Sequence, residues 1–416
     1  MRSWIVGLLG IGLVSSASGA EWELSIPPKE GEKYQSAAFR LWVPDHVPTL
    51  RALIIRQHGC GRAGLDHASD LQWQALAIKH RAALLGTHFI PQKECADWFV
   101  PTNGSERALA DALAKFAQES KHPELPQLPM AIWGHSGGAL WAMHYVARHP
   151  ERMIAAVPRS QALVDLPEAS MGVPVLLQYG EQEKTGRFEA VHRNSLASMQ
   201  KNRPRGAVWA SSIDPKSSHD CRRGRDLSIR FLDAALTARL PLADSPTAAL
   251  RPVDRSRAWL GNPDTLAIFP ADKYPGDANA ASWLIDETFA KAWQTFGKTG
   301  ELTDTTPPPA PIAVSVARDT NGGMRIRWLA VADLESGIRG FRVLRDGKEI
   351  AVVGSPKGRD NAQGLFQSWN YGDEAVPRNP SMTLFDRDGT TTSIYKVITV
   401  NRDGLESTAT VGTEAK

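Results

Sequence analysis

The sequence contains little cysteine and no long hydrophobic run beyond its N-terminal segment. Only 3 cysteines occur among 416 residues, which excludes a small scaffold built on disulfides. No stretch has the roughly 18 apolar residues that a membrane-spanning helix needs. The formal net charge is only +3, and basic and acidic residues are interspersed. We therefore expect neither a nucleic-acid partner nor a membrane span.

The N-terminus has the pattern of a secretory signal. Arg2 precedes an apolar core, Trp4 to Val14, and Ser18-Gly19-Ala20 has the small-x-small form of a cleavage site. Residues 1–20 are therefore predicted to be a signal peptide, and the mature chain is predicted to be exported, to the periplasm or beyond the cell. In an oxidising compartment, Cys60, Cys95 and Cys221 should give one disulfide and one free thiol, and their spacing leaves the pairing open.

Residues 21–240 alternate between strand-like and helix-like patterns. Such alternation predicts a mostly parallel sheet with helices on both faces, which is an α/β domain. The predicted strands are 23–26, 39–43, 52–55, 83–90, 130–133, 153–157, 173–179 and 207–212. The predicted helices are 69–80, one starting near 105, 139–148, 188–200 and 226–238.

The remaining chain divides into three parts. Residues 241–304 break the alternation and are predicted to be an extension packed on the first domain. Residues 305–311 are rich in proline, which predicts a stiff linker. Residues 312–416 alternate with a period of two, which predicts short strands of an all-β sandwich.

The stretch from Met130 to Gly138 has the form of a nucleophile elbow. An apolar strand leads into Gly134-His135-Ser136-Gly137-Gly138, and a helical pattern follows. In this motif the small flanking residues allow a strained turn that exposes the serine hydroxyl. Ser136 is therefore a candidate nucleophile.

A nucleophilic serine needs a base, and the base needs a carboxylate that orients it. In open α/β sheets these groups gather beyond the carboxyl ends of the strands. The loop after strand 207–212 contains His219, and the loop after strand 173–179 contains Glu181 and Glu183. The chain order is thus serine, acid, histidine.

Over residues 21–240 the chain resembles an α/β-hydrolase without a large lid. Within that superfamily it is similar to secreted esterases of the polyhydroxyalkanoate depolymerase and feruloyl esterase type. Three motifs carry this resemblance: His58-Gly59-Cys60-Gly61, Cys95-Ala96-Asp97-Trp98-Phe99, and the Gly-x-x-acid loop of 180–183.

The resemblance implies a Ser136–His219–Glu183 triad. Glutamate stands where aspartate is usual, and Glu181 lies two residues away, so Glu181 and Asp165 remain alternative acids. The resemblance also implies an oxyanion hole formed by the backbone N–H groups of Gly137 and Cys60, with Gly61 as an alternative donor.

Two further expectations concern the residues around this hole. Cys60 and Cys95 follow neighbouring predicted strands, so a disulfide between them that braces the oxyanion loop is a hypothesis. Trp98 and Phe99 are candidate substrate-binding residues.

The C-terminal segment resembles a fibronectin type III module. The resemblance rests on the proline-rich entry, Trp328 on an early strand, and the Tyr395-x-Val397 strand near the end. Modules of this kind mostly act as spacers or adaptors, so we expect no chemistry there.

Two patterns for other ligands are weaker. Gly59, Gly61 and Gly64 match a dinucleotide fingerprint, but no carboxylate follows about 20 residues later to bind the ribose. His58, Cys60, His219 and Cys221 lack the close spacing of a zinc site. We therefore predict no cofactor and no metal.

The sequence thus predicts an exported serine carboxylic ester hydrolase. Its substrate would be an acylated polysaccharide or another bulky or polymeric ester. A serine peptidase of the same fold, or a non-catalytic exported adhesion protein, remain the alternatives. The oligomeric state stays open.

Overall fold

The structure is a computed structural model that describes most of the chain. The described residues are 19–61, 64–93, 95–163, 165–220, 224–242, 248–331, 333–354 and 382–415. The predicted signal peptide lies outside them except for Gly19 and Ala20, which begin the first strand. Cys221 also lies outside the described residues.

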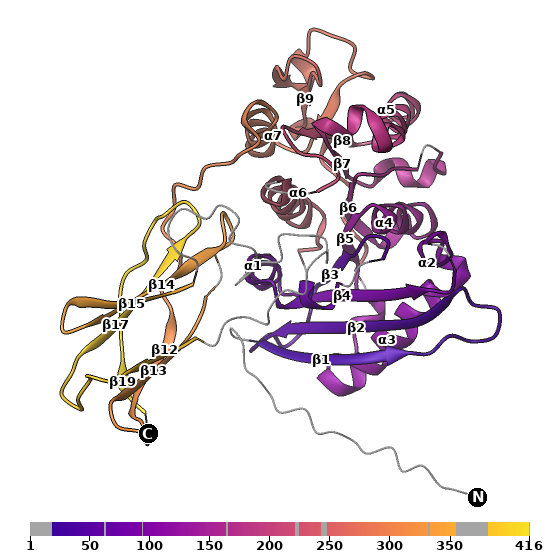
Figure 1. Cartoon of the computed structure of the whole chain (residues 1–416). Helices are drawn as coiled ribbons and strands as arrows, with labels where there is room; N and C mark the ends of the chain where they lie inside the picture. Colours follow the sequence, from indigo (N-terminus) through magenta and orange to yellow (C-terminus); the bar gives the residue numbers. More distant parts are fainter. Residues whose placement is uncertain are drawn as a thin grey trace, which may run out of the picture.

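A central sheet of eight strands organises residues 19–214 (Figure 1). Its strand order is β1-β2-β4-β3-β5-β6-β7-β8. The pairings β1–β2 and β2–β4 are antiparallel, and every pairing from β4 through β8 is parallel. The strands are β1 Gly19–Ile26, β2 Tyr34–Pro44, β3 Ala52–Gln57, β4 Ala82–Pro91, β5 Met130–His135, β6 Met153–Arg159, β7 Val175–Gly180 and β8 Trp209–Asp214.

Helices cover both faces of this sheet. On one face, α1 (Leu71–His80), α6 (Gly224–Arg239) and α7 (Glu287–Thr299) share a buried core with the sheet. On the other face, α3 (Ser105–Ser120), α4 (Gly137–Arg148) and α5 (Glu189–Asn202) form a second core. Strands β3, β5, β6 and β7 are buried along their whole length, as expected for parallel strands between two helical layers.

Two features make the fold α/β-hydrolase-like. The mostly parallel sheet agrees with the predicted fold class, and α4 follows β5 with only Ser136 between them. Between β6 and β7 the described residues form only a short 3-10 helix, Glu168–Gly172.

None of the described helices is long and apolar enough to cross a membrane.

Residues 248–304 pack against the edge of the large sheet. Here β9 (Trp259–Gly261) pairs with both β10 (Ile268–Pro270) and β11 (Ser282–Leu284). The Trp293 indole N–H donates to the carbonyl oxygen of Ser211 on β8 at 2.6 Å. The Ser211 amide donates to Ser282 Oγ at 3.0 Å.

The described residues of the C-terminal segment form two four-stranded sheets around one core. The first has the order β16-β13-β12-β19 and the second β15-β14-β17-β18. Trp328 on β13 packs against Phe341 on β14, with ring centroids 5.5 Å apart. The strands are β12 Ile312–Arg318, β13 Met324–Leu329, β14 Ile338–Arg345, β15 Lys348–Gly354, β16 Thr383–Asp386, β17 Tyr395–Asn401, β18 Thr410–Val411 and β19 Thr413–Glu414.

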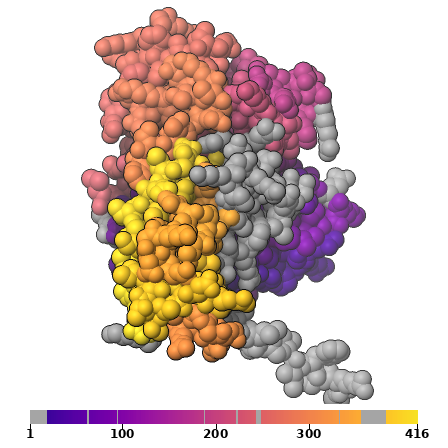
Figure 2. Space-filling model, turned by 60° about the vertical axis from the view of Figure 1, so that its left-hand side comes forward, coloured from indigo at the N-terminus to yellow at the C-terminus, as the bar shows by residue number. Residues whose placement is uncertain are grey.

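These two sheets contact helices α1 and α6. Leu71 of α1 belongs to the core of the C-terminal sheets. The Gln72 side chain donates to the Leu334 carbonyl at 3.2 Å, and Arg402 pairs with the buried Asp226 at 3.2 Å. Figure 2 shows the C-terminal strands, orange to yellow, along one side of the molecule.

Candidate active site

Ser136 lies in a strained turn between β5 and α4. Its φ of 52° and ψ of −116° are unusual for a residue with a side chain. A Cβ atom added to Gly134 would lie 2.1 Å from the Gly138 carbonyl oxygen, so position 134 must be glycine. The geometry is that of the predicted nucleophile elbow.

Glu183 and His219 meet beyond the ends of β7 and β8. His219 Nδ1 lies 2.5 Å from Glu183 Oε1. Glu183 is fully buried, and its Oε2 accepts hydrogen bonds from the Gly180 amide at 2.7 Å and from Ser160 Oγ at 2.9 Å. Because Nδ1–H donates its hydrogen bond to the carboxylate, Nε2 is the atom left to accept a proton from a nucleophile.

The other two candidate acids lie elsewhere. Glu181 is exposed, and its Oε2 accepts the Lys216 amide hydrogen bond at 3.0 Å. Asp165 forms an ion pair with Lys201 at 3.3 Å, and its side chain is 75% exposed. Of the three carboxylates considered from the sequence, Glu183 is the one that contacts His219.

The turn at Ser136 and the loop of His219 are in direct contact. His135 Nε2 donates to the His219 carbonyl oxygen at 2.7 Å, and the two rings lie 4.7 Å apart. A Cβ atom on Gly180 would lie 2.1 Å from the Ser218 carbonyl oxygen, so the acid loop also packs tightly on this loop. Within the described part of the chain, Ser136 Oγ forms no hydrogen bond with His219. Catalytic hydrogen bonds are often long before substrate binds.

Phe188 covers one face of the His219 ring. It ends a 3-10 helix, Gly186–Phe188, that follows the acid loop. The two rings are parallel within 1°, and their centroids are 4.0 Å apart. The stacking fixes the plane of the imidazole, so this contact orients His219.

The predicted oxyanion loop lies over the start of α4. A Cβ atom on Gly59 would lie 3.4 Å from Ser136 Cβ, and one on Gly137 would lie 2.6 Å from Cys60 Sγ. Cys60 forms a disulfide with Cys95, as hypothesised from the sequence, and their Cα atoms are 5.3 Å apart. The backbone around Cys60 is thus held beside Gly137, the first residue of the helix.

His58 fixes the conformation at the start of this loop. The Phe89 amide donates to His58 Nε2 at 2.8 Å, so Nδ1 carries the proton and donates to the Gly59 carbonyl at 2.6 Å. Burial lowers the pKa of His58 to about 3. The imidazole therefore stays neutral and keeps both hydrogen bonds across the physiological pH range.

The two aromatic candidates for substrate contact differ in accessibility. Trp98 is 0% exposed and stacks on Phe89 at 5.7 Å. It lies in the core under the disulfide, so its indole offers no surface to a substrate, contrary to our expectation. Phe99 is half-buried and lies parallel to His144 at 6.5 Å.

Sequence reasoning missed two residues of the site, Arg159 and Ser160. Arg159 is the last residue of β6 and Ser160 follows it, at the carboxyl end of a strand next to β5. A charged residue at the end of an apolar buried strand was the available signal. Both side chains are fully buried.

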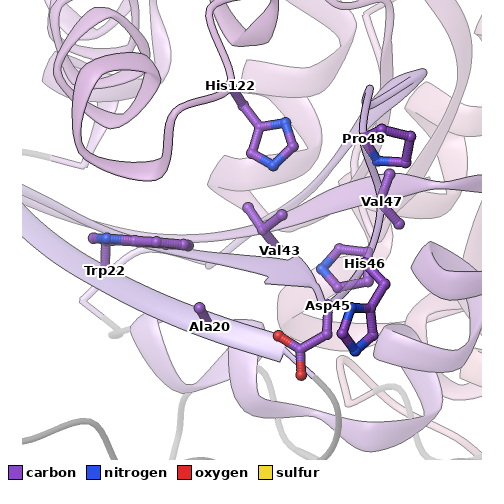
Figure 3. Close-up of a pocket in the computed structure, with 9 residues that line it drawn as sticks. Ala20, Trp22, Val43, Asp45, His46, Val47, Pro48 and His122 are labelled. Carbon is purple, nitrogen blue, oxygen red and sulfur yellow. The ribbon is translucent and has the colours of Figure 1, made fainter.

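A separate cavity of about 370 Å³ lies at the amino-terminal end of the parallel strands (Figure 3). Ser136 lies at the opposite, carboxyl end, so this cavity is not part of the triad. Its lining residues are Ala20, Trp22, Val43, Pro44, Asp45, His46, Val47, Pro48 and His122.

The described residues contain no group of three or more His, Cys, Asp or Glu side chains placed to hold a metal ion. The sulfur of Cys60 is bonded to Cys95. Cys60 therefore has no free thiolate with which to bind zinc together with His58, His219 and Cys221.

Comparisons with known proteins give distant structural likenesses. No protein-family model matches the chain, and no curated protein matches it. Among solved structures it is similar to a poly(3-hydroxybutyrate) depolymerase from Bordetella parapertussis, with 13% identity over 54% of this chain and 92% of that chain and a TM-score of 0.38. An esterase from an Arctic intertidal metagenomic library has 15% identity, 58% and 100% coverage and a TM-score of 0.39. A dienelactone hydrolase from Anabaena variabilis has 18% identity, 49% and 88% coverage and a TM-score of 0.34. At this level the likenesses assign no activity to the chain.

Proposed function

We propose that this chain is an exported serine carboxylic ester hydrolase that forms an acyl-enzyme on Ser136. The observation that supports the proposal best is the 2.5 Å contact of His219 with the buried Glu183, next to the strained turn of Ser136. These are the three groups of a serine hydrolase, in the chain order of α/β-hydrolases.

In this proposal each residue has a defined role. Ser136 Oγ attacks the ester carbonyl and its proton passes to His219 Nε2, while Glu183 stabilises the imidazolium. The N–H groups of Gly137 and Cys60 donate to the developing oxyanion, and losing one such donor costs on the order of 3 kcal/mol. His219 then protonates the leaving alcohol. A water molecule next attacks the acyl carbon and gives its proton to His219, which returns a proton to Ser136 Oγ as the carboxylic acid leaves.

The domain assignment is part of the proposal. The catalytic domain is residues 21–240, the extension 241–304, the linker 305–311, and a fibronectin type III-like sandwich 312–416. The two C-terminal sheets around the Trp328 core support the last assignment.

Export and a bulky substrate are likewise proposed. A signal at residues 1–20 would send the chain to a compartment where the Cys60–Cys95 disulfide is stable. The connection between β6 and β7 is too short to form a large lid domain, which suits an acylated polysaccharide or a polyester as substrate.

The test compares the wild-type protein with Ser136→Ala. The wild type should hydrolyse p-nitrophenyl acetate and react with a fluorophosphonate at Ser136, and the variant should do neither while keeping its thermal transition. Cleavage of aminoacyl anilides in place of esters would indicate a serine peptidase. Failure of the wild type to react with the fluorophosphonate would favour a non-catalytic protein.

A second assay addresses the substrate class. Acetylated xylan, a feruloylated sugar and a short polyester should be offered to the same pair of proteins. We expect Ser136-dependent turnover of at least one of these three. Turnover of small soluble esters alone would contradict the proposed bulky substrate.

A further inference from the structure

Arg159 contacts both the nucleophile and the loop of the base. Its carbonyl oxygen accepts the Ser136 amide hydrogen bond at 2.8 Å. Its guanidinium Nη2 donates to Ser217 Oγ at 2.9 Å, to the Ser218 carbonyl at 3.2 Å, and to the Asp220 carbonyl. The last two carbonyls flank His219, so one side chain holds both ends of the segment that carries the base.

The Arg159 side chain is fully enclosed. Its exposed fraction is 0%, and the buried Asp214 lies 3.6 Å from Nη2. A guanidinium offers its donors in a rigid planar arrangement, whereas a lysine offers one ammonium on a flexible stem. All three acceptors in the loop of His219 bond to one nitrogen, Nη2, at the tip of this planar group.

Ser160, the next residue, contacts the third member of the triad. Its hydroxyl donates to Glu183 Oε2 at 2.9 Å, on the carboxylate whose Oε1 faces His219. Its amide donates to the Gln178 carbonyl at 2.7 Å. Its φ of 62° places it in the left-handed region, which residues with a side chain seldom adopt.

We propose that Arg159 and Ser160 are positioning residues that align Ser136, His219 and Glu183 with one another, an inference that rests on the proposed triad. The dipeptide contacts Ser136 through its backbone, the loop of His219 through the guanidinium, and Glu183 through the serine hydroxyl. A strained serine is retained at position 160 because glycine, which fits a positive φ, has no hydroxyl to donate.

Ser160→Gly separates the hydroxyl from the backbone conformation. Glycine relieves the positive φ, so the melting temperature should be unchanged or higher, whereas the Glu183 carboxylate loses a charge-assisted hydrogen bond. We expect kcat to fall about 10- to 100-fold, with KM unchanged. Ser170→Ala is the matched control: Ser170 is equally buried, but its hydroxyl donates to Val146, away from the triad.

Arg159→Lys tests the guanidinium. It keeps the charge beside Asp214, but the lysine nitrogen lies one bond nearer to the backbone than Nη2, the atom that meets all three acceptors. We expect a fall in kcat with little change in KM, and a wild-type kcat in this variant would contradict the role given to Arg159.

A proton NMR measurement distinguishes this inference from the proposed function. The His219 Nδ1 proton, shared with Glu183, should give a far-downfield signal in the wild type and in Ser170→Ala, and a shifted signal in Ser160→Gly. If the wild type hydrolyses no ester, the proposed function fails, and the signal still tests the positioning. If Ser160→Gly keeps both the wild-type kcat and the wild-type signal, the positioning role is wrong.

Discussion

The ring of Phe188 lies parallel to the imidazole of His219, with the centroids 4.0 Å apart and the planes 1° apart. In a serine hydrolase the imidazole becomes positively charged in the transition state. The face of an aromatic ring attracts a nearby cation, with an energy of about 0.5–1 kcal/mol at partly exposed sites. In the proposed mechanism Phe188 therefore stabilises the imidazolium of His219 as well as orienting the ring.

Phe188→Leu should lower kcat about 3- to 10-fold while KM stays close to that of the wild type. Leucine fills much of the space, but it has no aromatic face for the imidazolium. Phe188→Tyr keeps the ring and is the matched control, for which steady-state kinetics should give nearly the wild-type kcat. Equal kcat values for the leucine and tyrosine variants would refute a specific role of the ring.

Glu183→Gln should reduce kcat by about four orders of magnitude, as loss of the triad carboxylate does elsewhere. The amide can accept from Gly180 and Ser160, but it cannot stabilise an imidazolium in the same way. Glu181→Gln is the control, since Glu181 is exposed and contacts only the loop backbone at Lys216. Ester hydrolysis by the two purified variants decides the matter, and similar losses in both would reopen the identity of the acid.

Removing the Cys60–Cys95 disulfide should lower both stability and activity. The bridge spans 35 residues, a loop for which chain entropy predicts about 3–4 kcal/mol of stabilisation. Cys95→Ser should lower the urea midpoint, and it should also reduce kcat because Cys60 Sγ packs beside Gly137. A variant with a lower midpoint and a wild-type kcat would show that the bridge supports the fold alone.

Asp333 should make stability depend on pH. It is buried, and burial together with the nearby Asp304 raises its pKa to about 7. The folded chain therefore holds a proton that the unfolded chain loses near pH 4, so the stability contributed by this group is present below about pH 4 and is lost as the pH rises to about 7.

Asp333→Asn removes this group's titration. From pH 5 to pH 8, the free energy of unfolding of the wild type should fall relative to that of the variant, as measured by urea denaturation. Asp388→Asn, at an exposed position, is the control and should follow the wild type. A constant difference between wild type and Asp333→Asn across this range would contradict the prediction.

Local sequence patterns predicted most elements of the large sheet because parallel strands and their covering helices have strong apolar periodicity. The strand predicted at 130–133 extends to His135, and the helix predicted at 139 begins at Gly137. Both shifts have one cause: in the elbow Ser136 alone separates β5 from α4, so each element extends to the residue next to Ser136. Apolar patterns do not mark such a boundary, since glycine and histidine weaken the signal on both sides.

The sequence predicted that Ser136, His219 and Glu183 lie in loops after strands, and the structure brings His219 and Glu183 into contact; their catalytic roles stay a proposal. Trp98 was assigned from its neighbours in sequence and is enclosed by Phe89 and His58. Arg159 and Ser160 act through contacts with residues far along the chain. Such contacts depend on how the strand ends meet in space, which a single sequence does not specify.

The junction between Arg402 and Asp226 links the C-terminal sheets to the first turn of α6. That turn follows the loop of His219 directly in the chain, and Leu71 on α1 adds apolar contact at the same face. Separating the C-terminal sheets from the large domain would remove the Arg402 partner of the Asp226 carboxylate. It would also expose the apolar face of α1 around Leu71 to water. The C-terminal sheets and the large domain should therefore melt together in a single calorimetric transition, with the loop of His219 protected from hydrogen exchange up to that temperature.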